Sequence, residues 1–127
     1  GLSNVDITRL ISYHREQNTF ATVTAIQPAG RFGGIELAGL RVKKFLEKPK
    51  GDGRWISGGF FVCEPEVFAR IEGDQTVWEK EPLESLARDN QLAVFKHEGF
   101  WKAMDTLRDK EQLEQLNQDG LAPWKVW

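Results

Sequence analysis

The hydrophobic and polar positions along the chain predict helices and strands in irregular alternation. Ile7, Leu10, Ile11 and His14 recur at helical spacing, which predicts an amphipathic helix over residues 5–17. Further patterns predict strands over 20–26, 31–37, 40–48, 55–63, 92–97 and 101–104, and helices that begin near Pro65, Pro82 and Thr106. Because helices and strands alternate around one inserted hairpin, we expect an α/β fold with a mixed sheet.

Several apolar or weakly polar side chains are expected inside this fold. The run at residues 60–62 is typical of a central strand that is covered on both faces. A lone cysteine is expected to behave as a small apolar side chain, and a histidine on an apolar helix face is expected to be packed. The side chains expected to be buried are Phe60, Phe61, Val62, Cys63, Val67, Phe68, Ile71 and His14.

Composition narrows the class of protein. The 127 residues fit one domain or part of one, and a net charge of −2 without a Lys/Arg block gives no nucleic-acid footprint. The chain has one cysteine, no apolar run of about 20 residues and no signal peptide at its start. We therefore expect a cytoplasmic protein that binds neither nucleic acid nor membranes. The opening Gly-Leu-Ser-Asn, which lacks Met, favours a fragment of a longer protein.

The segment Glu47-Lys48-Pro49-Lys50 is the first candidate for chemistry. It lies where a predicted strand meets a glycine-bearing loop, and ligand crevices form at strand ends in open α/β sheets. A carboxylate can accept sugar hydroxyls, and a neighbouring ammonium can bind a phosphate as a point charge. A solvated, charged strand end explains the same residues.

Two further segments carry candidate residues. In Ser57-Gly58-Gly59-Phe60, adjacent glycines inside a strand indicate either a close approach of a ligand or a bulge. In Asp105-Thr106, the carboxylate follows a predicted strand and precedes a helix. It can supply one oxygen to Mg²⁺, which takes one or two carboxylates together with phosphates and waters, or it can cap the helix.

These segments, in this order, resemble the sugar nucleotidyltransferase family. Residues 44–52 (KFLEKPKGD) are similar to its E-K-P segment, and residues 55–61 (WISGGFF) to the glycine-bearing strand that follows there. Residues 99–106 (GFWKAMDT) are similar to the segment that ends in a metal aspartate, although Leu107-Arg108 departs from the family's usual Gly-Thr. The two ends, residues 4–7 and 122–127, are similar to the branch that uses CTP and glucose 1-phosphate.

The resemblance implies a role for each matching residue. Glu47 would bind sugar hydroxyls, Lys48 would contact the sugar phosphate, and Gly59 would offer its backbone to the sugar. Asp105 would hold Mg²⁺, and Trp55 and Trp101 would shape the sugar pocket. The implied catalytic residues are Lys48 and Asp105.

The resemblance also implies what lies elsewhere in such a protein. The nucleotide-binding segment and a first metal aspartate would belong to an N-terminal half, and the Rossmann-like domain would be complete only with it. We expect that the fragment alone is inactive and that the full-length protein is a homo-oligomer. A nucleotidyltransferase that uses another nucleotide, a non-catalytic sugar-phosphate-binding module and a structural interaction domain remain alternatives.

Overall fold

The computed structural model describes residues 1–28, 34–38, 41–46 and 53–127. Side chains of residues 34–38 and 41–46 are not described. The strands are β1 (Leu2–Ser3), β2 (Ala21–Ile26), β3 (Gly34–Ala38), β4 (Arg41–Leu46), β5 (Ile56–Cys63), β6 (Leu92–Lys96) and β7 (Trp101–Lys102). The helices are α1 (Ile7–Gln17), the 3₁₀ helix η1 (Pro65–Arg70), α2 (Glu81–Arg88) and α3 (Leu107–Gln118).

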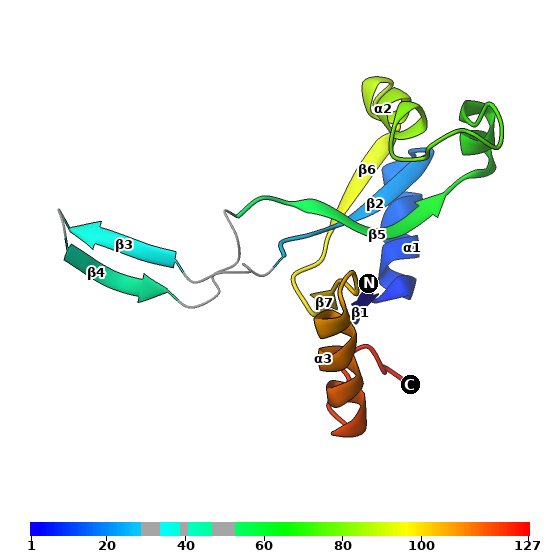
Figure 1. Ribbon diagram of the computed structural model, residues 1–127. Coiled ribbons are helices and arrows are strands. Elements are labelled where there is room, and N and C mark those ends of the chain that lie inside the picture. Colours follow the sequence, from blue (N-terminus) through cyan, green and yellow to red (C-terminus); the bar gives the residue numbers. More distant parts are fainter. Residues whose placement is uncertain (29–33, 39–40, 47–52) are drawn as a thin grey trace.

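A mixed three-stranded sheet forms the centre of the chain (Figure 1). Its order is β5-β2-β6, with β2 antiparallel to β5 and parallel to β6. Strand β2 is the central and most buried strand, because apolar and threonine side chains face both sides of it. The expectation of an α/β fold with a mixed sheet is confirmed.

Helix α1 begins and ends where its sequence supplies caps. The Asp6 side chain accepts a hydrogen bond from the Arg9 backbone N–H at 3.0 Å, and Asn18 ends the helix in the left-handed region at φ 51°. The helix packs across all three strands of the sheet. On this face, the ring of Tyr13 meets that of Phe95 edge-on at 5.4 Å between centroids.

His14 connects α1 to two neighbouring elements. Its side chain is only 3% exposed, Nδ1 lies 2.7 Å from Thr22 Oγ1, and Nε2 lies 2.9 Å from Glu64 Oε1. The packed histidine expected from the helix pattern is therefore confirmed, with polar partners at both ring nitrogens. Because Thr22 belongs to β2 and Glu64 precedes η1, one ring fastens three elements at the amino end of β2.

The tightest core lies at this same amino end. Ala21, Val67 and Leu86 are almost fully buried, and they come from β2, η1 and α2. Half-buried apolar residues surround them, namely Phe20, Trp78, Leu83 and Leu92. Burial of a side chain such as Leu86 contributes about 1.5–3 kcal/mol. The predicted helices at Pro65 and Pro82 are thus confirmed as the cover of this end of the sheet.

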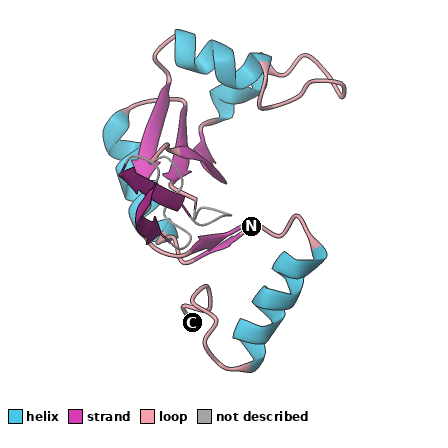
Figure 2. Cartoon of the chain, turned by 60° about the vertical axis from the view of Figure 1, so that its left-hand side comes forward, coloured by secondary structure: helices cyan, strands magenta, loops and turns pink. Residues whose placement is uncertain are grey.

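The chain's first and last strands meet at the other end. Strand β1 pairs with β7 in antiparallel register, with Leu2 opposite Lys102 and Ser3 opposite Trp101. Helix α3 follows β7, and the tail returns so that the Trp124 ring lies 5.8 Å from that of Phe100. Figure 2 shows α3 beyond the β1–β7 pair, away from the three-stranded sheet.

A separate hairpin joins β2 to β5. Strands β3 and β4 pair antiparallel, with Gly34 opposite Leu46 and Ala38 opposite Arg41. In Figure 1 this hairpin lies to one side of the three-stranded sheet. The inserted hairpin is confirmed, with Ala38 as the last residue of β3.

Four expectations about burial and strand position are wrong for the described chain. Strand β5 is at the edge of its sheet, since its apolar run meets β2 on one side only. Phe68 is 71% exposed and Ile71 39% exposed, because the 3₁₀ geometry of η1 turns only Val67 toward the core. Cys63 is exposed, although partial burial still raises the pKa of its thiol.

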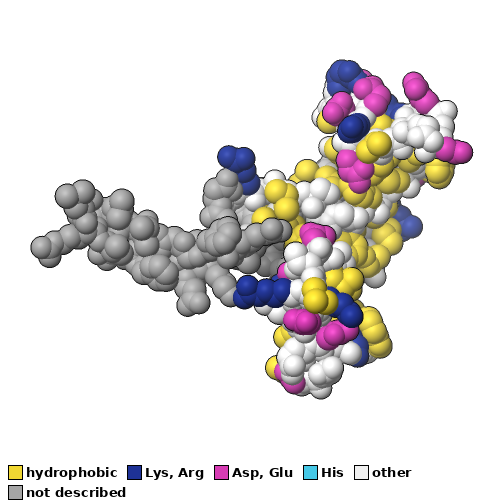
Figure 3. Space-filling view, viewed as in Figure 1, with side chains coloured by type: hydrophobic (Ala, Val, Ile, Leu, Met, Phe, Trp, Pro, Cys, Tyr) yellow, Lys and Arg dark blue, Asp and Glu magenta, His cyan; other side chains and the backbone are white. Residues whose placement is uncertain are grey.

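Hydrophobic side chains remain visible over the body of the chain, between α2 and α3 (Figure 3). Over the described residues as a whole, the hydrophobic side chains that expose more than a third of their surface include Ile56, Phe68, Val77, Val94 and Leu107. None of the described helices has the length and apolar character needed to cross a membrane.

Candidate functional site

The carboxyl ends of β2 and β6 form the edge where the candidate residues gather. The two strands run parallel, with Ala25 opposite Lys96, so both end on the same side of the sheet. Strand β5 runs the other way and therefore starts there, with Ile56 opposite Ile26. Ligands of open α/β sheets bind outside the carboxyl ends of strands, which makes this edge the candidate site.

A bulge interrupts β5 at this edge. Val23 pairs with Phe61 and Ala25 with Ser57, so Thr24 alone stands opposite the three residues 58–60. A bulge re-aims the backbone away from the sheet, and such bulges are frequent beside active sites. The two glycines of the sequence motif fall inside it.

Each glycine of the bulge has its own physical reason. Gly59 has φ +83°, a conformation that side-chain-bearing residues rarely adopt. At Gly58, an added Cβ would lie 3.1 Å from Ile26 Cγ2 and 3.2 Å from the Thr24 carbonyl oxygen. Gly59 is exposed, which is compatible with the predicted role of offering its main chain to a sugar.

Two tryptophans flank the bulge. The Trp101 indole Nε1–H donates to the Gly58 carbonyl oxygen at 2.9 Å, which joins β7 to β5. The half-buried Trp55 ring lies under Lys96 Nζ, 5.2 Å from the ring centroid. The structure thus brings Trp55, Gly59 and Trp101 to one edge, as their predicted shared role requires.

Asp105 lies between β7 and α3 and does not cap the helix. Thr106 is the N-cap and accepts the Asp109 backbone N–H at 3.1 Å, while Asp109 Oδ2 accepts the backbone N–H groups of Thr106 and Asp105 at 3.2 and 3.3 Å. Hydrogen bonding with the Thr106 side chain is the main cause that lowers the pKa of Asp109. Among the described residues, the exposed Asp105 carboxylate has no hydrogen bond or ion pair.

The Asp105 carboxylate fits a magnesium site in which it is one of several ligands better than a site built from the described residues alone. Among the described residues, no group of three or more His, Cys, Asp and Glu side chains is placed to hold a metal ion. Mg²⁺ in nucleotide sites uses one or two carboxylates, with substrate phosphates and waters as the other ligands. One exposed hard oxygen donor, which has no competing cation among the side chains that the structure describes, is consistent with that arrangement.

Glu47 and Lys48 lie outside the described residues. The chain is described up to Leu46 at the end of β4 and again from Gly53. The Gly53 carbonyl oxygen accepts a hydrogen bond from Gln27 Nε2 at 2.7 Å, directly beyond the carboxyl end of β2. The predicted roles of Glu47 and Lys48 therefore stay predictions.

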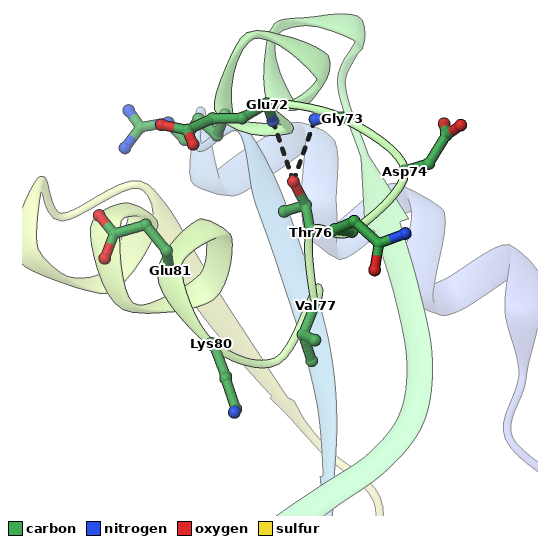
Figure 4. Close-up of a pocket in the computed structure, with 9 residues that line it drawn as sticks. Glu72, Gly73, Asp74, Thr76, Val77, Lys80 and Glu81 are labelled. Carbon is green, nitrogen blue, oxygen red and sulfur yellow. Dashed lines mark hydrogen bonds between the residues drawn. The ribbon is translucent and has the colours of Figure 1, made fainter.

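Two surface hollows lie at the other end of the three-stranded sheet, away from the carboxyl ends of β2 and β6. The larger, of about 560 Å³, is lined by Arg70, by residues 72–77 and by Lys80 and Glu81. Figure 4 shows that Thr76 lies at its centre, where Oγ1 accepts the backbone N–H groups of Glu72 and Gly73. The second, of about 330 Å³, lies beside His14 and Glu64. Both are open and adjoin the amino end of β2, so concavity alone does not identify the candidate site.

Sequence reasoning missed two residues at the candidate edge. Lys96 was not singled out, although a lysine that closes an apolar strand is a usable signal. For His97 the neighbouring sequence offers no Ser or Cys partner, whereas in the structure its Nε2 lies 3.1 Å from the Phe100 carbonyl oxygen. The contact of Lys96 with Trp55 depends on the sheet, which one stretch of sequence does not reveal, whereas the bond of His97 to Phe100 lies within one turn.

Comparison with known proteins identifies the family to which the chain belongs. Residues 2–110 match the family model described as nucleotidyl transferase. The chain therefore belongs to the nucleotidyl transferase family.

Individual members of the family match this chain over its whole length. The chain is 50% identical over 127 residues to a protein named glucose-1-phosphate cytidylyltransferase from Salmonella typhimurium, covering all of this chain and 49% of that protein. It is 42% identical over 128 residues to a protein from Bacillus subtilis named as a probable enzyme of the same kind, covering 100% and 50%. The chain thus spans about half the length of the curated relatives that it matches.

A solved structure supports the fold. The crystal structure of a Bacillus anthracis protein, provisionally described as a glucose-1-phosphate thymidylyltransferase in complex with a sucrose, superimposes with a TM-score of 0.61. The match covers 92% of this chain and 51% of that one, at 17% sequence identity. The α/β arrangement with a mixed sheet is therefore shared with that protein.

Proposed function

We propose that residues 1–127 form the C-terminal, sugar-phosphate-binding portion of a glucose-1-phosphate cytidylyltransferase. The observation that carries this proposal is 50% identity along the whole chain to a protein of that name. The chain would be part of a Rossmann-like domain with β3 and β4 as its inserted hairpin. In the proposed reaction, a phosphate oxygen of glucose 1-phosphate attacks the α-phosphorus of CTP. The bond from that phosphorus to the bridging oxygen breaks, and CDP-glucose and pyrophosphate result.

The sugar would lie over the bulge of β5. Gly59 presents exposed backbone at this end of the sheet, and Trp55 and Trp101 would form walls beside it. Glu47 would accept hydrogen bonds from the sugar hydroxyls, and Lys48 would hold the attacking phosphate through its ammonium group. These contacts would position the nucleophile, which is the main contribution that a protein makes to phosphoryl-type transfer.

Asp105 would be one metal ligand. Mg²⁺, when bound, neutralises charge on the substrate phosphates. In the register of β1 and β7, Leu2 lies opposite Lys102, so a residue preceding Gly1 in a longer protein would approach the segment between Lys102 and Asp105. This supports the expectation, implied by the family resemblance, that a further metal carboxylate comes from the N-terminal half.

The test compares two variants of the full-length protein that contains this chain. Asp105→Ala should lower kcat by at least about a hundredfold, since it removes a metal ligand, whereas Lys50→Ala should change it little. Pyrophosphate release and CDP-glucose formation are measured with CTP and glucose 1-phosphate across a Mg²⁺ titration. Equal losses in the two variants would mean that Asp105 is not the metal carboxylate.

Substrate titrations separate the alternatives. Turnover with UTP, GTP or dTTP in preference to CTP would show a nucleotidyltransferase of different base choice. Binding of glucose 1-phosphate without Mg²⁺-dependent CTP binding by the full-length protein would show a sugar-phosphate-binding module. The homo-oligomer and the cytoplasmic location are predictions that light scattering and cell fractionation would test.

A further inference from the structure

Three hydrogen-bond donors converge on one carbonyl oxygen in the turn between β6 and β7. The Phe100 oxygen accepts from Ser3 Oγ at 2.8 Å, from the Asn4 backbone N–H at 3.2 Å and from His97 Nε2 at 3.1 Å. A carbonyl oxygen has two lone pairs and cannot donate. The His97 ring must therefore carry its hydrogen on Nε2, which fixes its tautomer when it is neutral.

The turn leaves no room for a side chain at position 99. A Cβ added at Gly99 would lie 2.6 Å from Asn4 Oδ1, 2.8 Å from His97 Cε1 and 3.0 Å from His97 Nε2. The space beside Gly99 is thus filled by the Asn4 and His97 side chains. Asn4 Oδ1 is also buried without a hydrogen-bond partner among the described residues, a cost that is tolerated where the surroundings dictate the position.

The same turn is fastened to the candidate site on both sides. The His97 backbone N–H donates to the Ala25 carbonyl oxygen at 2.9 Å, which extends the parallel ladder of β2 and β6. After the turn, Trp101 bonds to Gly58 in the bulge. Asp105 follows three residues after the end of β7, so its direction of approach is set by how β7 leaves this turn.

We propose that His97 is a positioning residue for Asp105. Its Nε2–H holds the Phe100 carbonyl in place beside Ser3 and Asn4 and so fixes β7, from which the chain runs to the metal carboxylate. This inference rests on the proposed function, in which Asp105 binds Mg²⁺. His97 itself touches neither substrate nor metal in this scheme.

Two substitutions of similar size test the proposal in the full-length protein. A glutamine amide nitrogen can occupy the place of a histidine Nε2, whereas the shorter asparagine reaches only the place of Nδ1. His97→Gln should therefore keep Mg²⁺ dependence near that of the wild type. His97→Asn should raise the Mg²⁺ concentration for half-maximal rate about tenfold, as loss of a supporting contact around a metal ligand does, with KM for glucose 1-phosphate changed less than about twofold.

The other histidine of this chain supplies a matched control. His14 also has ring hydrogen bonds, at both nitrogens, and is more deeply buried than the half-buried His97, but it lies at the amino end of β2. His14→Asn should lower the unfolding midpoint without changing the Mg²⁺ requirement. If His97→Asn lowers only the midpoint, or if His97→Gln and His97→Asn behave alike, the positioning role is wrong.

A readout independent of activity is the nitrogen NMR spectrum of the wild-type imidazole rings. The signal that disappears in His97→Gln should show a protonated Nε2 and an unprotonated Nδ1 at pH 8. A ring protonated on Nδ1 would overturn the proposal even if His97→Asn failed to fold. Failure of the underlying function looks different, because Asp105→Ala would then retain its rate while the His97 tautomer stayed as proposed.

Discussion

At the residue scale, adjacent glycines in β5 lack a side chain for different reasons. Gly59 needs its backbone conformation, and Gly58 needs the space that Ile26 and Thr24 already occupy. The Gly-Gly pair therefore reflects two constraints, one on backbone conformation and one on space. Substitution of each glycine separates them.

Gly58→Ala should destabilise the protein by about 1–3 kcal/mol, since its methyl group would press on backbone as well as side chain. Gly73→Ala is the matched control, because an added Cβ there meets nothing within 4 Å. Urea unfolding of the two variants in the full-length protein measures the difference. Equal free energies of unfolding would show that the bulge can shift to accept a methyl group.

The pKa of Asp109 leads to a prediction about pH. Its folded pKa is lowered from the ordinary value of 3.8, so its contribution to stability is present above the unfolded pKa and is lost as pH falls through the folded pKa. Asp109→Asn should therefore be less stable than the wild type at pH 7, and the difference should shrink below about pH 4. Thermal unfolding at pH 7 and at low pH checks this. A difference that is constant across pH would exclude the charged capping box as its cause.

At the scale of elements, periodicity and capping residues predicted most of the structure. Asp6, Asn18 and Thr106 mark helix boundaries because their side chains or left-handed backbone satisfy terminal groups locally. Local chemistry of this kind is readable from neighbouring residues. The burial of Phe68 and the central position of β5 were predicted wrongly, because a pattern shows which faces are apolar and not what covers them.

The candidate site was predictable to a similar extent. The glycine pair and the exposed carboxylate of Asp105 were identified from sequence, whereas the contact of Lys96 with Trp55 was not, since it joins two strands. The alternative in which Asp105 caps α3 was resolved only by the capping hydrogen bonds of Thr106 and Asp109. Glu47 and Lys48 rest on the motif alone.

The link between β7 and β5 gives a prediction at this scale. Trp101→Phe keeps an aromatic ring but loses the donor to the Gly58 carbonyl, which should cost about 1 kcal/mol and raise KM for glucose 1-phosphate. Trp124→Phe, which retains an aromatic partner for Phe100, should leave KM unchanged. Initial-rate kinetics of both full-length variants test this. A normal KM in Trp101→Phe would show that the bulge does not depend on the indole.

At the scale of the whole molecule, the described candidate residues gather at one end of the sheet and would supply one carboxylate to the proposed metal site. The chain spans about half the length of its curated relatives, and it exposes apolar side chains from several elements. We infer that the proposed reaction requires both this chain and the remainder of a longer protein.

The 127-residue chain on its own should therefore release no pyrophosphate from CTP and glucose 1-phosphate. Its expected inactivity follows from an incomplete metal site, with one carboxylate in place of two. A coupled pyrophosphate assay on the isolated chain, run beside the full-length protein, is the measurement. Steady release by the isolated chain would show that it contains a complete catalytic centre.

The pairing of β1 with β7 has a consequence for how the protein is made. Leu2 lies opposite Lys102, so 100 residues separate the two partners along the chain. At typical ribosomal speeds of about 5–20 residues per second, the first strand waits roughly 5–20 s before its partner is synthesised. Pairings so distant in sequence also close late, because the entropy lost in joining a long loop comes before any contact compensates for it. The N-terminal segment, which pairs with β7 and so approaches Asp105, is thus expected to be among the last parts of the chain to reach its final position.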